Sequence, residues 1–209
     1  RYDESTDRFT FFRHDPNNPH SLSHNDVRAI LVDTTGTLWV GTTQGLNRWD
    51  DKAEHFIHYR HQTGQVGSLS DDEINALHQD SLGQLWVGTT LGLNRFNAET
   101  KTFSHFFHDA KAEHSLSHDE FNTLYTTDDG SLWVGTDNGL NHFNQQQQIF
   151  TRYFNNPNNI NSLSHNRVYS ISQDEHQILW IATKGGLNKL DLSSQTFSHY
   201  SEKNGLQSN

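Results

Sequence analysis

Histidine and aspartate recur at one fixed point along this 209-residue chain, and they are the first candidates for chemistry. His24, His118 and His165 are equivalent positions of a 47-residue repeat, and Asp71 takes that position in the remaining copy. Because each is followed by Asn or Asp, a ring of imidazole and carboxylate groups around a channel would resemble a metal site. The simpler interpretation is that they cap turns through hydrogen bonds. We therefore predict no metal and no cofactor.

A second set of candidates varies in chemistry inside a constant apolar frame. It consists of Arg28, Asn75, Asn122 and Tyr169, one from each repeat. If these residues border a channel, their amides, guanidinium and ring suit a polar ligand such as a sugar. The alternative is that they pack between repeats or contact water. A third set lies in a short variable turn, where we expect ligand specificity from Gln44, Asp137, Asn138 and Lys184.

Catalytic signatures are weak in this chain. It contains no GxSxG, P-loop, GxGxxG or HExxH pattern. The adjacent acids Asp71–Asp72 and Asp128–Asp129 fall in predicted turns, where carboxylates are usually solvated. We predict that the chain is not an enzyme. A lyase or hydrolase is a less favoured alternative, since it would need convergent His, acid or metal groups.

Composition restricts the partners. The formal net charge of −10 argues against nucleic acid, and no apolar run is long enough for a membrane span, so no membrane contact is expected. The chain has no Cys, which excludes disulfides and thiolate chemistry. It also has no Met, so we expect a processed product or a piece of a longer protein.

The repeat itself organises the chain. The step of 47 residues relates Trp39, Trp86, Trp133 and Trp180, and it relates the "SLS" triplets that begin at Ser21, Ser68, Ser115 and Ser162. It also relates Phe9, Phe56, Phe103, Phe150 and Phe197. A period in the forties is typical of a propeller blade of four strands.

Each repeat predicts four short strands. The first resembles "NDVRAILVD", the second is "LWVGT", the third begins with "GLN", and the fourth begins at the periodic Phe. A turn with positive φ is expected at Gly36, Gly83 and Gly130, where the fourth copy has Gln177. In "LWVGT", Leu and Val face one side and Trp the other, so both faces are apolar, as between two neighbouring blades. The adjacent Gly is expected to let a neighbouring aromatic ring pack closely.

The frame "SLSxxxVxxIxxDxxGxLWVGTxxGLNRxD" resembles the two-component regulator propeller repeat, over almost the entire chain. The resemblance implies a β-propeller in the extracytoplasmic sensor region of a bacterial membrane signalling protein. Histidine kinases and diguanylate cyclases carry such regions, and the location would be periplasmic. It also suggests a carbohydrate or related nutrient as ligand.

We expect one all-β propeller segment over residues 1–209, with four-stranded antiparallel blades. Its repeats span about 21–67, 68–114, 115–161 and 162–208, and residues 1–20 are the outer strand of a preceding blade. The final "NGLQSN" resembles the start of a fifth repeat. Further repeats, a second copy of the chain, or a strained four-bladed ring would each remove the exposed strand edges.

The polar loops that join one blade to the next are expected to lie on the same face as the variable turns, as binding loops do. The predicted function is a non-catalytic sensor module that binds a small polar ligand. The alternative is an interaction or dimerisation scaffold without such a ligand, which an exposed apolar patch would favour. His14, His61 and His108 also recur, and we expect them to be solvent-exposed.

Overall fold

The computed structural model describes residues 2–4 and 6–206, which form four antiparallel sheets of four strands. Blade 1 comprises β3 (Val27–Val32), β4 (Leu38–Thr42), β5 (Gly45–Asp50) and β6 (His55–Tyr59). Blade 2 comprises β7 (Ile74–Gln79), β8 (Leu85–Thr89), β9 (Gly92–Asn97) and β10 (Thr102–Phe106). Blade 3 comprises β11 (Phe121–Thr126), β12 (Leu132–Thr136), β13 (Gly139–Asn144) and β14 (Ile149–Tyr153). Blade 4 comprises β15 (Val168–Gln173), β16 (Leu179–Thr183), β17 (Gly186–Asp191) and β18 (Thr196–Tyr200), and a short 3-10 helix, η1 (Glu202–Asn204), follows.

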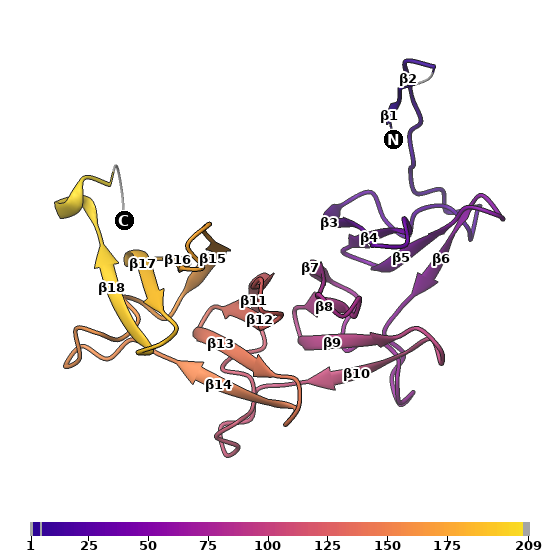
Figure 1. Cartoon of the computed structure of the whole chain (residues 1–209). Helices are drawn as coiled ribbons and strands as arrows, with labels where there is room; N and C mark the ends of the chain where they lie inside the picture. The colour runs from indigo at the N-terminus through magenta and orange to yellow at the C-terminus, as the bar shows by residue number, and fades with distance from the viewer. Residues whose placement is uncertain (1, 5, 207–209) are drawn as a thin grey trace.

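The blades lie side by side along an open arc, with the first strand of each blade on the concave side (Figure 1). These inner strands contact one another in succession, β3 to β7, β7 to β11 and β11 to β15. The predicted all-β propeller of four-stranded blades is confirmed. The alternative of a closed four-bladed ring is wrong, because the inner strand of blade 1 leaves Ile30 66% and Val32 62% exposed.

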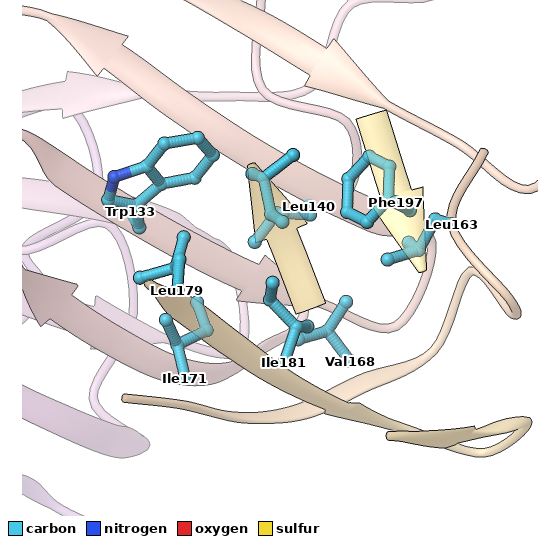
Figure 2. Close-up of a cluster of buried hydrophobic side chains, with 9 residues drawn as sticks. Trp133, Leu140, Leu163, Val168, Ile171, Leu179, Ile181 and Phe197 are labelled. Carbon is cyan, nitrogen blue, oxygen red and sulfur yellow. The ribbon is translucent and has the colours of Figure 1, made fainter. Parts of the chain in front are cut away.

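The hydrophobic core lies between neighbouring blades. Between blades 3 and 4, Trp133 and Leu140 of one blade meet Leu179, Ile181 and Phe197 of the next (Figure 2). Equivalent clusters fill the other two junctions. As predicted, the "LWVGT" strands of blades 2 and 3 bury both of their faces, the Trp against the following blade and the Leu and Val against the preceding one.

The glycine of each "LWVGT" strand allows the next blade to approach. A Cβ on Gly41, Gly88 or Gly135 would lie 2.5 to 3.4 Å from side-chain atoms of Ile74, Phe121 or Val168. The expectation of an aromatic neighbour therefore holds only at Phe121, and the shared feature is the first residue of the next inner strand. Blade 4 has Ala182 at this position, and no described blade follows it.

A buried asparagine explains why "SLS", "GT" and "GLN" recur together. In blade 2, Asn94 accepts a hydrogen bond from the Ser70 backbone N–H (2.9 Å) and donates to Ser70 Oγ (2.8 Å) and to the Val87 carbonyl (3.2 Å). Ser70 Oγ also bonds Thr89 Oγ1 at 2.8 Å. The same network surrounds Asn47, Asn141 and Asn188. Because buried polar groups must be paired, the Ser, Thr and Asn side chains of these motifs stabilise the blade and are not free to bind a ligand.

The N-terminal residues form a hairpin of β1 (Tyr2–Asp3) and β2 (Arg8–Phe9), in which Tyr2 pairs with Phe9. One repeat later, Trp49 pairs with Phe56 between β5 and β6. The hairpin therefore matches the end of the third strand and the start of the fourth strand of a preceding blade. The fourth strand was predicted from Phe9, whereas the contribution of the third strand was not.

Residues 10–14 continue this segment without strand pairing. Phe12 nevertheless packs on Trp49 and Phe56, with ring centroids 4.9 and 5.4 Å away. One blade later Tyr59 packs in the same way on Phe96 and Phe103. Ring packing of Phe12, together with the hydrogen bonds of His14 to Asn25 and to the Leu22 carbonyl, therefore holds this segment in the place of an outer strand.

The first turn of each blade needs positive φ, as predicted. Gly36, Gly83 and Gly130 have φ of 85°, 77° and 87°. Gln177 adopts φ of 62° at the equivalent point, so the fourth blade keeps the turn in spite of its side chain. The tail predicted to begin a fifth repeat extends into residues 207–209, which lie outside the described residues.

Candidate functional site

The loops between blades and the turns between second and third strands lie together at one end of the strands, and we call this the loop face. Backbone hydrogen bonds join them within each blade, from Thr43 to Asp26, from Thr90 to Glu73, from Asp137 to Glu120 and from Lys184 to Arg167. Further bonds cross from blade to blade, for example from the Gly139 N–H to the Asn166 carbonyl at 2.7 Å. The loop face is therefore a continuous surface over several blades, where a bound ligand can touch more than one blade.

The recurrent His and Asp residues cap turns on this face. The Nδ1 atoms of His24, His118 and His165 accept hydrogen bonds from the backbone N–H two residues later, at 2.9 to 3.1 Å. Asp71 Oδ1 accepts the same bond from Glu73 at 2.8 Å. The capping interpretation is confirmed. Over residues 2–4 and 6–206, no group of three or more His, Asp or Glu side chains is arranged to hold a metal ion.

The second histidine series has a structural role that we did not predict. His14, His61 and His108 each donate from Nδ1 to a leucine carbonyl of the following loop at 2.8 Å. Asn155 makes the equivalent bond in the fourth copy, at 2.7 Å. The expectation of solvated rings is wrong for His14 and His108, which are half-buried, although His61 is exposed. The repeated leucine carbonyl creates the need for a donor at this position.

A β-bulge lies at the variable inner-strand position of every blade. The register shifts between Val27 and Ala29 in blade 1, and at the equivalent points of the other three. The residue at each shift has no partner on the second strand; these residues are Arg28, Asn75, Asn122 and Tyr169. Because a bulge re-aims its side chain, it separates these residues from the apolar face of their strand. Tyr169 is accordingly 48% exposed.

Blades 3 and 4 bring several candidates together. Asp137 Oδ1 accepts a hydrogen bond from Asn122 Nδ2 at 2.8 Å and an ion-pair contact from Arg167 Nε at 3.0 Å. The Arg167 guanidinium lies 5.7 Å from the centre of the Tyr169 ring. We call Asn122, Asp137, Arg167 and Tyr169 the junction cluster. It offers donors, a carboxylate and an exposed aromatic face within one connected group.

A second polar contact extends the junction cluster. Asn166 Nδ2 of blade 4 donates to Asn138 Oδ1 of blade 3 at 3.0 Å. Both residues belong to the loop face, so two separate contacts link the same pair of blades. The candidates Asn122, Tyr169, Asp137 and Asn138 thus come from two blades into one site.

The other candidates, Arg28, Gln44 and Asn75 of blades 1 and 2 and Lys184 of blade 4, lie outside the junction cluster. Arg28 contacts Asp26 at 3.2 Å within its blade and Glu73 of blade 2 at 3.7 Å. Gln44 and Lys184 are exposed in their turns and lie outside both of these groups. Asn75 is half-buried at its bulge.

Arg167 is the site residue that sequence reasoning missed. The equivalent residues of the other copies are Asp26, Glu73 and Glu120. One basic residue in an otherwise acidic series is a signal that the sequence contains. Its partner Asp137 lies in the previous repeat, so the pairing becomes visible only when the blades are placed side by side.

The repeats match the sequence model of the family described as two component regulator propeller, over residues 21–44, 68–90, 115–138 and 162–185. Among solved structures, the extracellular domain of the putative hybrid two component system BT3049 from B. thetaiotaomicron is similar. It has 29% identity and a TM-score of 0.75, and the match covers 86% of this chain and 25% of that one. This chain therefore spans about a quarter of that relative.

A more distant structure shares the fold alone. It is a catalytically inactive virginiamycin B lyase from Staphylococcus aureus, with 16% identity, a TM-score of 0.62 and coverage of 86% of this chain and 57% of that one. No curated protein matches the chain. Within residues 2–4 and 6–206, no helix has the length and apolar character needed to cross a bilayer.

Proposed function

Because the four repeats of this chain are two-component regulator propeller repeats, we propose that it is a non-catalytic sensor segment of a bacterial membrane signalling protein. The observation that carries this proposal is the similarity to an extracellular domain of a putative hybrid two component system, at 29% identity and a TM-score of 0.75. The same similarity supports a location outside the cytoplasm, and we propose the periplasm. The output domain, a histidine kinase or a diguanylate cyclase, would lie elsewhere in the parent protein.

The junction cluster is our candidate for the ligand site. Its carboxylate, guanidinium and amide groups can exchange hydrogen bonds with hydroxyl groups, and the exposed Tyr169 ring offers an apolar platform. This mixture suits a small, hydroxyl-rich ligand such as a sugar. The net charge of −10 argues against nucleic acid as an alternative partner.

The location of the cluster suggests how binding would become a signal. Asp137 belongs to blade 3, whereas Arg167 and Tyr169 belong to blade 4, so a ligand bound there contacts both blades. A ligand shifts an equilibrium only if it binds two arrangements unequally. A ligand that contacts both blades binds two arrangements of the blades unequally whenever those arrangements differ at this junction.

A calorimetric screen of neutral and acidic sugars against the purified chain tests this function. We expect one class to bind and the Tyr169→Ala substitution to weaken it at least tenfold. Tyr2→Ala is the matched control, because both tyrosines are 48% exposed and Tyr2 lies in the N-terminal hairpin. No binding by any sugar, or equal loss in both variants, would contradict the ligand site.

A second proposal concerns the exposed face of blade 1, which favours a role in assembly. Apolar residues line a cavity of about 560 Å³ there, and they include Phe11, Ile30, Val32 and Trp49. At every other junction the equivalent face is covered by a Trp and a Leu of the preceding blade, such as Trp39 and Leu46. We propose that a preceding repeat of the same polypeptide covers blade 1, because the N-terminal hairpin already has the register of that blade.

Native mass spectrometry of the 209-residue chain tests this assembly. A monomeric mass supports the proposal. So does a higher melting temperature for a longer chain that includes the preceding repeat. A stable dimer whose formation requires Ile30 would contradict it and identify a second copy of the chain as the cover.

A further inference from the structure

A polar pocket lies between blades 1 and 2, at the end of the strands away from the loop face. Its volume is about 480 Å³, and its lining includes the turns that precede β4 and β8 and the turn that follows β9. Since β4 runs from this pocket toward the turn at Thr43, the pocket and the loop face are at opposite ends of the strands. It therefore forms no part of the junction cluster.

The two carboxylates of the pocket, Asp33 and Asp80, already accept hydrogen bonds at all of their acceptor sites. Asp33 accepts hydrogen bonds from the Thr35 and Thr37 backbone, the Thr35 hydroxyl and Trp39 Nε1, at 2.6 to 2.9 Å. Asp80 accepts four in the same way, from the Leu82 and Gln84 backbone and from the side chains of Trp86 and Gln145, at 2.9 to 3.2 Å. A carboxylate has about four acceptor sites. Neither Asp33 nor Asp80 therefore offers a further acceptor to a bound cation.

The basic residues of the pocket, in contrast to its carboxylates, have hydrogen-bonding capacity that is not used. The Arg48 side chain is about a quarter exposed, and its nearest carboxylate partner, Asp50, is 4.0 Å away. Arg48 Nε is buried with no hydrogen-bond partner. A guanidinium carries five N–H donors, so most of the donor capacity of Arg48 is unmet.

Two more cations lie in the same pocket. Lys101 is exposed, donates to the Ala98 carbonyl and lies 5.9 Å from the centre of the Phe96 ring. Arg95 donates to Gln148 and lies over the rings of Trp86 and Phe106. Both bonds go to neutral acceptors, so neither cation is neutralised by a carboxylate in these contacts. The pocket thus has spare donors and positive charge.

We propose that this pocket binds the anionic group of a small ligand, a carboxylate, sulfate or phosphate. Arg48 and Lys101 supply the charge, and Arg48 supplies paired N–H donors that suit a planar carboxylate or a tetrahedral oxyanion. The anion contacts both blade 1 and blade 2. Bound there, it stabilises the junction of these two blades independently of any ligand on the loop face.

The pocket between blades 3 and 4 is an internal control. There the equivalent of Arg48 is His142, the equivalent of Arg95 is Lys189, and the equivalent of Lys101 is the neutral Gln195. That pocket is lined by Lys189 together with Asp129 and Asp191. Its acids outnumber its lysine, so we expect no anion to bind.

Isothermal titration of the chain with phosphate, sulfate or glucuronate, at constant ionic strength, tests the proposal. Glucose serves as the neutral comparison for glucuronate. We expect at least one anion to bind, Arg48→Gln and Lys101→Gln to weaken it at least tenfold, and Lys189→Gln to leave it unchanged. The phosphate, sulfate and glucuronate arms distinguish which oxyanion the pocket prefers.

Two results would overturn this proposal. One is that no anion binds the unsubstituted chain at millimolar concentration; the other is that Lys101→Gln binds as the unsubstituted chain does. Lys101 is exposed, so its substitution leaves the fold intact and keeps the test valid if Arg48→Gln unfolds. Tyr169→Ala is expected to leave anion binding unchanged, which separates this test from that of the proposed function.

Discussion

Trp133 lacks a hydrogen-bond acceptor for its buried Nε1 because Thr127 stands where the other three blades have an aspartate. In those blades Trp39, Trp86 and Trp180 each donate to the aspartate at 2.8 to 2.9 Å. The Thr127 hydroxyl instead donates to Asp129 at 2.6 Å. His142 stacks on the unpaired Trp133 ring, with centroids 4.7 Å apart, but stacking leaves the N–H unpaired.

The double substitution Thr127→Asp with Asp129→Thr should therefore stabilise the chain. It reproduces the Asp33 and Thr35 arrangement of blade 1 and avoids adding a carboxylate to the turn. We expect the free energy of unfolding to rise by about 1 to 2 kcal/mol, the cost of one unpaired buried polar group. Urea denaturation measures it, and Asp80→Thr should produce the reverse change. An unchanged midpoint would mean that the Trp133 N–H is already satisfied.

The buried asparagine network should be among the most sensitive points of each blade. Asn94→Ala removes bonds to the Ser70 N–H, the Ser70 hydroxyl and the Val87 carbonyl, and leaves all three groups buried. At about 1 kcal/mol for each bond, we expect a loss of about 3 kcal/mol. The exposed Asn122→Ala is the control and should cost less than about 0.5 kcal/mol. Similar losses in both variants would contradict a structural role specific to the network.

The sequence was sufficient for the blades but not for the contacts between their loops. Trp39 and Gly41 recur because they pack against the next blade, and Asn47 recurs because each blade needs the same internal hydrogen-bond network. A pattern repeated every 47 residues is enough to align the blades. The bulge at Arg28 and its equivalents leaves no mark in the residue pattern, since an extra residue in one strand keeps the 47-residue step unchanged.

The junction cluster was only partly predictable for a related reason. Asn122, Asp137 and Tyr169 were selected because they vary within a constant frame, but their association depends on the lateral placement of blades 3 and 4. Arg167 was missed because its partner is 30 positions earlier in the chain, in another repeat. Lateral contacts of this kind are set by how the blades pack against each other, and no local pattern encodes them.

Equivalent residues should differ in importance according to whether a blade covers them. Ile30 is 66% exposed at the open end of the arc, whereas its equivalent Ile171 is 5% exposed between blades 3 and 4. Ile171→Ser should lower the free energy of unfolding by about 2 to 4 kcal/mol, and Ile30→Ser by less than about 1 kcal/mol. Chemical denaturation of the two variants makes the comparison. Equal costs would show that Ile30 is covered in solution.

Acidification should destabilise the chain through histidines that are buried in the neutral form. Burial lowers the pKa of His58, of His78 and of His142, although nearby groups partly offset the effect. In the unfolded chain these rings titrate near the usual value of about 6.5. The unfolded state therefore binds more protons as the pH falls through that value, and the free energy of unfolding decreases.

Urea midpoints at pH 7.5, 6.5 and 5.5 measure this effect, and we expect a continuous decrease across the series. The hydrogen-bonded carboxylates act in a separate window, because Asp129 and Asp174 have lowered pKa values and lose their stabilising charge only at more acidic pH. His78→Gln removes one buried ring that titrates and should flatten the dependence between pH 6.5 and 5.5. A midpoint independent of pH in that interval, or a steeper decrease in His78→Gln, would show that these rings remain accessible to protons in the folded state.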